Sequence, residues 1–319
     1  MSENPEKVGK YRILGVAGRG GMGTVYIGRD PFNDRKVAIK VCSVGDPSDN
    51  AARLALKMFF SEAQSAGVLE NPNILRVFDA GEVDGDPFIV MEFVEGAATL
   101  KDYCDPERLL PIDRALDVFH QCAKALDCAH RRGVTHRDIK SANITLNVEG
   151  DAKIGDFGIA QCALSDQTQV MGMFGPPTYM SPEQARDDEL TSQTDVYSFG
   201  VVMYEVLAGR PPFRARGFSG LLNMILNENS PPLHELRPDV PPELAAIFER
   251  AMEKQVIDRY QTGGEIAADL GQIIESLKVS AALIDWASIP RQMRFNKAFT
   301  RVLIRRLAET SQRLASYLE

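Results

Sequence analysis

The stretch that decides the fold reads His136-Arg137-Asp138-Ile139-Lys140-Ser141-Ala142-Asn143. It follows a predicted helix over residues 111–132 and places a carboxylate, a cation and an amide within one loop. Phosphoryl transfer depends mainly on positioning and charge neutralisation. We therefore predict that Asp138 accepts or orients the proton of an attacking hydroxyl, that Lys140 neutralises the phosphoryl group and that Asn143 binds Mg²⁺. A loop cap at Asp138 beside a core histidine would explain neither the spacing nor Asn143.

A glycine-rich segment lies upstream, between two runs of strand-like composition at residues 11–16 and 24–29. Glycines lack Cβ atoms, so backbone amides can approach phosphate oxygens closely. In dinucleotide-binding folds such glycines lead into a helix, whereas here the β-favouring residues 24–27 follow. A flexible hairpin turn also explains the glycines taken alone. The predicted nucleotide contacts of this segment are Ala17, Gly18, Arg19, Gly20, Gly21, Met22, Gly23, Thr24 and Val25.

Three further charged residues extend the predicted site. Lys40 lies near the end of a strand-like run, residues 37–41, where its ammonium is expected to hold the α- and β-phosphates of ATP. Glu62, on a predicted helix over residues 51–70, is expected to pair with Lys40, although most single glutamates lie on a solvated helix face. Asp156 begins Asp-Phe-Gly after a short strand and offers hard oxygen ligands to magnesium.

The order of these motifs decides between the alternatives. Six features follow one another as in a protein kinase: the glycine loop, Lys40, Glu62, the Asp138 loop, Asp156 and Ser181-Pro182-Glu183. The last of these is predicted to belong to the peptide-docking segment, which receives the substrate peptide. Strand-like runs come first, and long helical stretches follow over residues 111–132, 195–208 and 242–254. We predict the α+β class and a bilobal protein kinase fold. Its N-lobe is a small antiparallel sheet with one main helix, and its larger C-lobe is mostly helical.

The chain resembles the eukaryotic-like serine/threonine protein kinases of bacteria over about residues 11–274. The most similar segments are residues 20–23, 89–94 and 179–185. The resemblance implies that Met91 is the gatekeeper beside the adenine and that backbone groups of Glu92 and Val94 bond to its edge. It also implies that the base lies between Val25 and Ala38 on one side and Thr145 on the other.

The same resemblance implies two structural contacts and exposes three departures, one of which is Thr145 in place of a usually larger apolar residue beneath the adenine. Asp195 is expected to anchor the catalytic loop, and Glu183 to pair with Arg259. The family usually has threonine directly after Gly175, where it bridges the positions of Asp138 and Lys140, but this chain has Pro176. Either Thr178 substitutes after a local shift, or the active arrangement is weaker. Ser141 replaces a usual proline.

Composition narrows the remaining function classes. The chain has 319 residues, of which 44% are hydrophobic and 25% charged, an ordinary globular mixture. A net charge of -8 argues against non-specific nucleic-acid binding. Five scattered cysteines predict neither a disulfide framework nor a zinc site. No run is apolar enough for a signal peptide or a membrane span, so we expect a cytoplasmic enzyme. From the motifs we expect protein substrates and the cofactors ATP and Mg²⁺, or alternatively Mn²⁺.

The predicted domain plan has three parts: a flexible N-terminus at residues 1–10, a kinase domain at 11–276 with lobes at 11–94 and 95–276, and a basic amphipathic helical extension at 277–319. The extension carries an apolar stripe beside a basic face. We prefer docking on the kinase's own helical lobe or on a second copy over contact with an anionic membrane. The stripe consists of Phe295, Phe299, Val302, Leu303 and Leu307.

The predicted activity is ATP-dependent phosphorylation of serine and threonine hydroxyls. The alternative is a pseudokinase scaffold, but such a protein usually lacks at least one of Lys40, Asp138, Asn143 and Asp156, and all four are present. Lys140, two positions after Asp138, resembles the serine/threonine branch rather than the tyrosine branch. We also predict control by autophosphorylation at Thr168, or secondarily Ser165, with Arg137 binding the phosphate.

Overall fold

The computed structural model describes residues 5–20, 23–42, 59–60, 63–64, 66–157 and 177–288, with side chains up to residue 279. The chain divides into two compact units, residues 1–273 and 274–319. The first unit contains both predicted lobes. The predicted sites at Gly21, Met22 and Glu62, the Thr168 and Ser165 hydroxyls, Pro176 and the apolar stripe of the extension lie outside the described residues.

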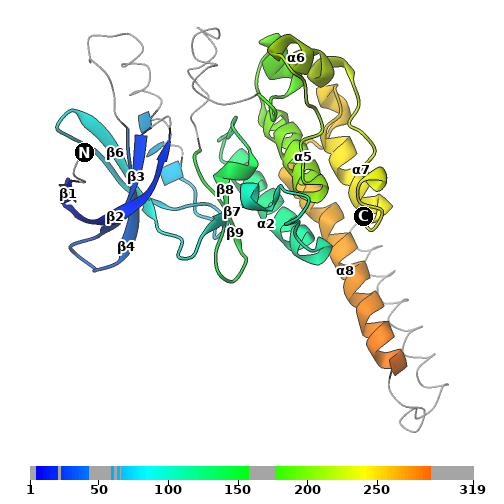
Figure 1. Ribbon diagram of the computed structural model, residues 1–319, viewed down its shortest axis with the longest axis horizontal. Helices are drawn as coiled ribbons and strands as arrows, with labels where there is room; N and C mark the ends of the chain where they lie inside the picture. Colours follow the sequence, from blue (N-terminus) through cyan, green and yellow to red (C-terminus); the bar gives the residue numbers. More distant parts are fainter. Residues whose placement is uncertain are drawn as a thin grey trace. The chain divides into compact units, whose positions relative to one another are not determined.

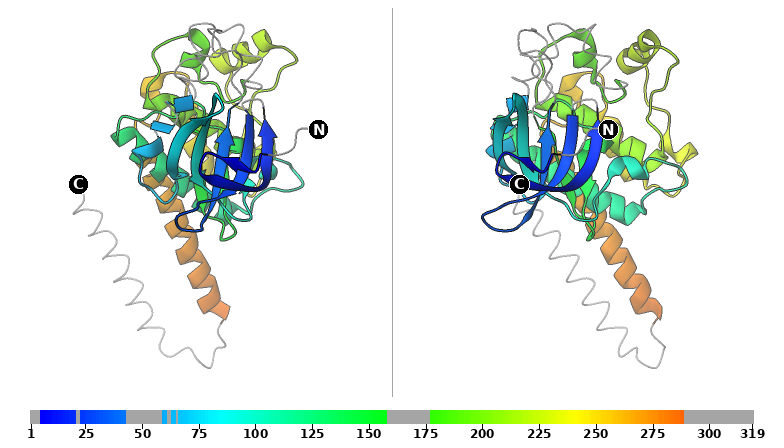
Figure 2. Two further views of the ribbon diagram at one scale, coloured as in Figure 1. Left: turned by 90° about the vertical axis from the view of Figure 1, so that its left-hand side faces the viewer. Right: turned by 60° about the vertical axis from the view of Figure 1, so that its left-hand side comes forward.

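The N-lobe contains one antiparallel sheet with the strand order β1-β2-β3-β4-β6-β5. Figures 1 and 2 show its strands side by side as one curved layer. The sequence predicts a helix between the fourth and fifth strands. The described residues of that segment, 59–60, 63–64 and 66–67, are helical. The strands are β1 (Lys7–Val8), β2 (Tyr11–Gly20), β3 (Gly23–Arg29), β4 (Lys36–Val41), β5 (Val77–Val83) and β6 (Asp86–Glu92).

Two N-lobe boundaries differ from the sequence prediction. β1 lies inside the segment predicted to be a flexible N-terminus, because Val8 is buried in the lobe core and pairs with Tyr11. The second difference concerns β5: two further strand-like runs in the sequence, residues 75–78 and 88–93, predict a strand from residue 75, but β5 starts at Val77. Leu75 donates its amide to the carbonyl oxygen of Ile154 at 2.8 Å, so this segment pairs with the C-lobe rather than with the sheet.

Alternation along β4 builds the N-lobe core. Val37 and Ile39 are fully buried and pack with Val90 of β6, as expected for a strand with one face toward the core. Gly23, at the start of β3, has a φ of +130°, and a Cβ there would lie 2.0 Å from the Val41 carbonyl oxygen. Only glycine fits this position. The strand that follows the glycines confirms that they do not open a helix.

The C-lobe is mostly helical. It contains α2 (Ile112–Arg131), α4 (Pro182–Arg186), α5 (Ser192–Ala208), α6 (Phe218–Asn227), α7 (Pro242–Ala251) and the start of α8 (Gly263–Ser288). A small sheet of β7 (Ala98–Thr99), β8 (Ile144–Leu146) and β9 (Ala152–Ile154) accompanies them. α5 packs against α2 and α7, and almost all of its residues are buried (Figure 1).

These elements confirm the bilobal fold and the helices predicted over residues 111–132, 195–208 and 242–254. One helix boundary is wrong, since α8 begins at Gly263 rather than at about residue 277. The Asp127 side chain of α2 accepts the amide of Gly264 at 3.0 Å, and Ile266 and Leu270 are fully buried. This first part of α8 therefore belongs to the C-lobe core.

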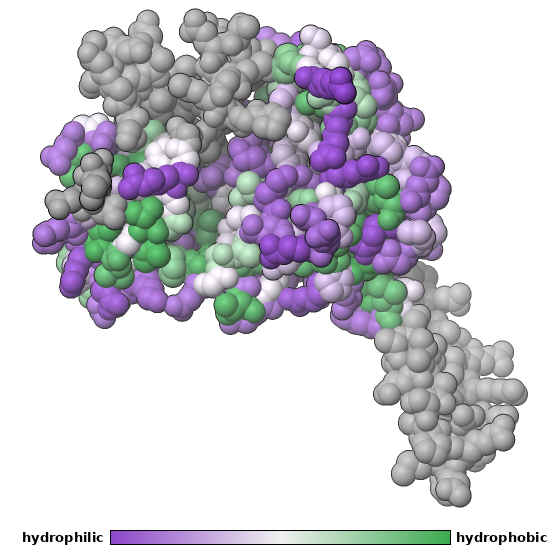
Figure 3. Space-filling model, viewed as in Figure 1, coloured by the Kyte–Doolittle hydropathy of each residue, from purple (hydrophilic) through white to green (hydrophobic). Residues whose placement is uncertain are grey.

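The described surface carries few large apolar side chains, and hydrophilic residues predominate over the helical lobe in Figure 3. An apolar patch lies over the N-lobe strands in the same view. No helix among the described residues is long and apolar enough to cross a membrane.

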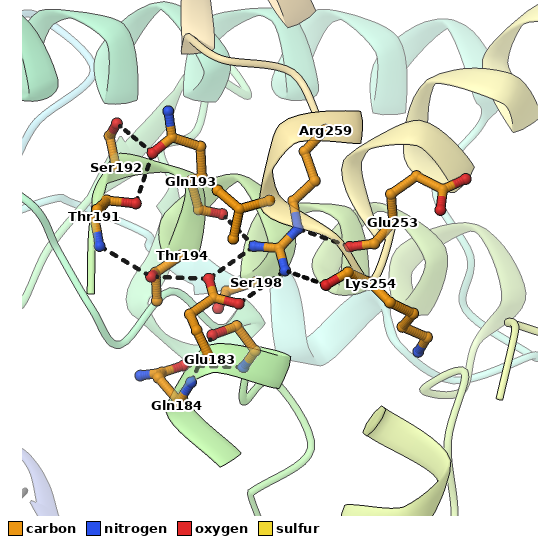
Figure 4. Close-up of polar contacts among 12 residues, drawn as sticks. Glu183, Gln184, Thr191, Ser192, Gln193, Thr194, Ser198, Glu253, Lys254 and Arg259 are labelled. Carbon is orange, nitrogen blue, oxygen red and sulfur yellow. Dashed lines mark hydrogen bonds and ion pairs between the residues drawn. The ribbon is translucent and has the colours of Figure 1, made fainter. Parts of the chain in front are cut away.

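A buried ion pair ties the C-lobe together, as predicted. Arg259 donates two hydrogen bonds to the Glu183 carboxylate, at 2.7 and 2.8 Å, and both residues are nearly inaccessible to solvent. Arg259 also donates to the carbonyl oxygens of Glu253 and Gln193, and Thr194 donates to Glu183 (Figure 4). The pair thus joins α4, the start of α5 and the segment after α7.

The electrostatics of this pair favour its charged form. Burial alone would raise the pKa of Glu183, but the hydrogen bonds and charge of Arg259, with help from Thr194, outweigh it and lower the pKa. A carboxyl group whose pKa is lower in the folded protein stabilises the fold at pH values above 4.5, the ordinary glutamate pKa. This contribution is lost as the pH falls through the lowered pKa.

Arg259→Leu should therefore reduce the free energy of unfolding by about 3–5 kcal/mol at neutral pH, because it leaves a buried carboxylate without its cation. Urea denaturation followed by circular dichroism measures this loss. Arg29→Leu is the control, since its ion pair with Asp34 is exposed and contributes about 0–1 kcal/mol.

The difference between the native protein and Arg259→Leu should shrink as the pH falls below the ordinary glutamate pKa, because the native pair is then lost too. A difference that stays constant into acid would contradict the charge assignment of Glu183.

Candidate active site

The catalytic loop between α2 and β8 brings together the three residues that the sequence predicts. The Asp138 carboxylate oxygen Oδ2 accepts hydrogen bonds from Lys140 Nζ at 2.7 Å and from Asn143 Nδ2 at 3.2 Å. Asn143 Nδ2 also donates to the backbone oxygen of Asp138 at 2.9 Å. Because the amide nitrogen makes both bonds, the amide oxygen of Asn143 remains as an acceptor for a cation. One carboxylate thus organises a cation and a hard oxygen ligand.

A buried carboxylate holds the backbone of this loop. Asp195, in the first turn of α5, accepts the amide of Arg137 on Oδ1 at 2.6 Å and the amide of His136 on Oδ2 at 2.7 Å. His130 Nε2 lies 2.7 Å from the same Oδ2. Arg137 has a φ of +67°, a costly conformation for a residue other than glycine, and these bonds fix it. The predicted anchoring role of Asp195 is confirmed.

His136 connects the catalytic loop to the segment that carries Asp156. Its Nδ1 accepts the amide of Asp138 at 3.2 Å, so the ring proton lies on Nε2, which donates to the Gly155 carbonyl oxygen at 2.8 Å. The ring also contacts Phe157, with 4.5 Å between centroids. The histidine is fully buried, yet both ring nitrogens position residues of the site.

The lysine and the second aspartate come from opposite lobes. Lys40 Nζ of β4 lies 3.0 Å from Oδ1 of Asp156, and the lysine side chain is only 10% exposed. Asp156 has a φ of +61°. Antiparallel pairing of β8 with β9 and the bond from Gly155 N to Asn143 O, at 2.9 Å, place Asn143 beside this segment. The two predicted metal ligands therefore belong to adjacent strand ends.

The predicted nucleotide contacts lie along the sheet next to Lys40. Ala38 is opposite Met91 in the register of β4 and β6, and Val25 of β3 is opposite Lys40. Gly18 and Gly20 of β2 pair with Val25 and Gly23 of β3. Ala17, Arg19 and Thr24 belong to the same hairpin.

The strand that carries Met91 ends at Glu92, and Val94 follows it as a half-buried residue. Thr145, on β8 of the small sheet, is also half-buried.

Sequence reasoning missed Lys153, which supports the Glu92 end of β6. Lys153 Nζ lies 3.0 Å from the Glu92 carboxylate and donates to the Pro72 carbonyl oxygen at 2.8 Å. It thereby connects β9 with β6 and with the segment before β5. A lysine in a three-residue strand carries no signal by itself, because its partners are distant in sequence.

The short helix α4 contacts the catalytic loop directly. Ser181 caps α4, accepting the amide of Gln184 on Oγ at 3.2 Å. The Gln184 side chain donates to the Arg137 carbonyl oxygen at 3.1 Å. Thr178 makes no hydroxyl hydrogen bond to Asp138 or Lys140 within the described part of the chain, so the suggested substitution for the missing threonine finds no support there.

Comparison with known proteins agrees with this geometry. Residues 11–267 match the family model described as "Protein kinase domain". The chain is 38% identical over 264 residues to a probable serine/threonine-protein kinase PknB of Lactococcus lactis, covering 82% of this chain and 41% of that protein. It is 38% identical over 263 residues to the serine/threonine-protein kinase PrkC of Bacillus subtilis, covering 82% and 40%.

Among solved structures, the crystal structure of the Mycobacterium tuberculosis PknI kinase domain is similar with a TM-score of 0.66 and 28% identity. The match covers 85% of this chain and 99% of that one. The chain thus belongs to the protein kinase domain family, and its relatives place it with the eukaryotic-like serine/threonine kinases of bacteria. It spans about two fifths of the length of the two curated relatives named above.

Asp195→Asn should loosen the catalytic loop. The backbone amides of His136 and Arg137 bind different oxygens of the carboxylate, whereas an asparagine side chain has only one acceptor oxygen. Since hydrogen bonds to charged groups contribute about 1.5–3 kcal/mol, we expect a stability loss of that size and faster hydrogen exchange at the His136 and Arg137 amides. Asp239→Asn, at an exposed pair with Arg237, is the control. Unchanged exchange at both amides would rule out the anchoring role.

Proposed function

We propose that this chain is an active protein kinase that transfers the γ-phosphate of ATP to serine and threonine hydroxyls of proteins. The observation that carries the proposal is the contact of Lys140 and Asn143 with one carboxylate oxygen of Asp138. A phosphoryl-transfer site needs an acceptor for the substrate proton, a cation for the developing charge and a metal ligand. All three lie within hydrogen-bonding distance here.

The proposed roles follow from the chemistry of each group. Asp138 orients the substrate hydroxyl and accepts its proton, while Lys140 stabilises the negative charge of the transferred group. Asn143 and Asp156 would hold Mg²⁺, or alternatively Mn²⁺, since both offer the hard oxygen donors that these ions prefer. When bound, the ion neutralises phosphate charge. Lys40 would hold the α- and β-phosphates, and its contact with Asp156 is compatible with a role beside the same phosphates.

The proposed adenine site lies where the two lobes meet. Backbone groups of Glu92 and Val94 would bond to the edge of the base, with Met91 beside it and Ala38 on one face. The half-buried side chains of Ala38, Met91 and Thr145 suit an apolar ring. Lys153 supports this proposal, because its bonds to Glu92 and to Pro72 restrain the strand end that would carry the contacts.

Serine/threonine specificity is proposed on two grounds. Lys140 lies two positions after Asp138 and contacts it, as expected for the branch that phosphorylates aliphatic hydroxyls. The curated relatives named above are also called serine/threonine-protein kinases. Against a pseudokinase scaffold stands the retention of Lys40, Asp138, Asn143 and Asp156, all of them in bonded positions.

Incubation with labelled ATP, magnesium and a generic protein substrate tests the activity. Asp138→Asn should lower turnover by about 10²- to 10⁴-fold, because it removes the proton acceptor, while the fold measured by circular dichroism remains. Lys40→Met should mainly weaken the handling of ATP. Lys10→Met is its control in the same lobe, since Lys10 pairs with Asp79 and neither residue adjoins a predicted nucleotide contact.

Full turnover by a folded Asp138→Asn protein would contradict the mechanism. Nucleotide binding without any transfer by the native chain, in magnesium or manganese, would instead favour the scaffold.

We also propose that phosphorylation at Thr168, or secondarily Ser165, activates the enzyme. Support comes from Arg137, whose guanidinium belongs to the residue directly before Asp138 and is of the kind that binds phosphate in a bidentate manner. Mass spectrometry should find the phosphate in protein with intact Asp138 and not in Asp138→Asn. Thr168→Ala should then reduce turnover, and unphosphorylated hydroxyls in a fully active enzyme would exclude this control.

A further inference from the structure

A second polar network contacts the catalytic loop, and none of its bonds has a role in the proposed function. It joins Ser141 of the loop, Tyr179 before α4, Glu205 of α5 and Lys101 of η1 (Leu100–Tyr103). Ser141 and Glu205 are almost completely buried. Their side chains therefore need partners inside the protein, because a buried unpaired polar group is costly.

The direction of each hydrogen bond in this network can be assigned. The Glu205 carboxylate is an acceptor, so the Tyr179 hydroxyl donates to Oε2 at 2.5 Å and Lys101 Nζ donates to Oε1 at 2.8 Å. A phenol has one proton. The 2.8 Å contact between Ser141 Oγ and Tyr179 Oη must then be donated by the serine. The chain of donors runs from the catalytic loop to a buried carboxylate, an arrangement in which each bond strengthens the next.

Tyr179 is fixed at both ends. Its carbonyl oxygen accepts a hydrogen bond from Ser198 of α5 at 2.8 Å, while its hydroxyl lies between Ser141 and Glu205. Burial, followed by the charge of Glu205, raises its pKa, so the hydroxyl keeps its proton. Met180 and the cap residue Ser181 come next in the chain. The position of Tyr179 therefore fixes the start of the segment predicted to receive the substrate peptide.

Two departures from the family pattern both concern a hydroxyl group that could bond to a neighbouring segment. The residue after Gly175 is Pro176, which has no hydroxyl to bond the catalytic loop, and the residue after Lys140 is Ser141, where the family usually has a proline without a hydroxyl. The chain has lost a hydroxyl link at one position and gained one at another. Both positions would join the same two segments.

We propose that Ser141 is a positioning residue that fixes the peptide-docking segment to the catalytic loop through Tyr179, in place of the threonine that this chain lacks. The inference rests on the proposed kinase activity. Lys140 and Asn143 flank Ser141 within three residues, so a shift of Tyr179 relative to Ser141 is a shift of the substrate hydroxyl relative to Asp138.

Kinetics with a peptide substrate test the proposal. Ser141→Ala removes one buried hydrogen bond, so kcat/KM for the peptide should fall about fivefold while KM for ATP remains unchanged. Ser192→Ala is the matched control, because it removes a serine hydroxyl of the same lobe that bonds to the Gln193 side chain at 3.3 Å and makes no contact with Tyr179 or Glu205.

A double-mutant cycle separates positioning from a general loss of packing. In a Tyr179→Phe background the effect of Ser141→Ala on the peptide kinetics should disappear, because the hydroxyl through which the serine contacts residue 179 is gone. Pro176→Thr should restore the peptide kinetics of Ser141→Ala. An undiminished effect in the Tyr179→Phe background would overturn the link through Tyr179, and a failed rescue would overturn the replacement of the missing threonine.

Hydrogen exchange makes the test independent of activity and of folding failure. In Ser141→Ala the amides of residues 179–184 should exchange about fivefold faster, while those of α2 remain protected as in the native protein. Unchanged exchange at residues 179–184 would overturn the proposal even if the native chain is a kinase. Faster exchange in a chain that transfers no phosphate would support the contact and reject the proposed function instead.

Discussion

The buried carboxylate of Asp195 is the interaction on which the site depends most. It lies at the start of α5, a helix with almost every residue inside the C-lobe, so its position is set by the whole core. From there it accepts two consecutive backbone amides, His136 and Arg137. A loop with a residue at positive φ would not keep its shape through its own contacts. The carboxylate supplies the rigidity, and Asp138 follows directly.

The second constraint is the contact between the lobes, to which β9 and Asp156, two residues after the strand, contribute directly. Leu75 of the N-lobe segment bonds to Ile154, Lys153 bonds to Glu92, and Lys40 pairs with Asp156 just beyond the strand. Residues 153–156 thus present a carbonyl group, a cation and a carboxylate to the other lobe within four positions. His136 then connects this segment to the catalytic loop through Gly155. Any movement of β9 must therefore displace residues proposed to bind nucleotide and residues proposed to bind metal together.

Buried polar pairs recur around the segment that precedes α5. Glu183 pairs with Arg259, and Glu205 accepts hydrogen bonds from Tyr179 and Lys101. Such pairs often add little net stability over apolar packing, since desolvation opposes the attraction. They nevertheless accept few alternative arrangements, because each donor and acceptor must be satisfied. The docking segment is thereby held in one register against the catalytic loop.

The local sequence determined the fold class and most of the predicted site. The Asp138 loop, Lys40 and Asp156 have distinct chemistry at fixed spacing, and strand and helix periodicity is visible wherever one face is buried. Tertiary structure alone decided the start of α8, which depends on Asp127 of α2, and the pairing of Leu75 with Ile154.

Tertiary structure also decided the partners of Lys153 and Ser141, since Glu92 and Tyr179 are 61 and 38 positions away. A spacing pattern can report only residues that share one element or one loop. Hydrogen bonds between distant segments arise when packing of the core removes water from both groups, and that requires the whole fold.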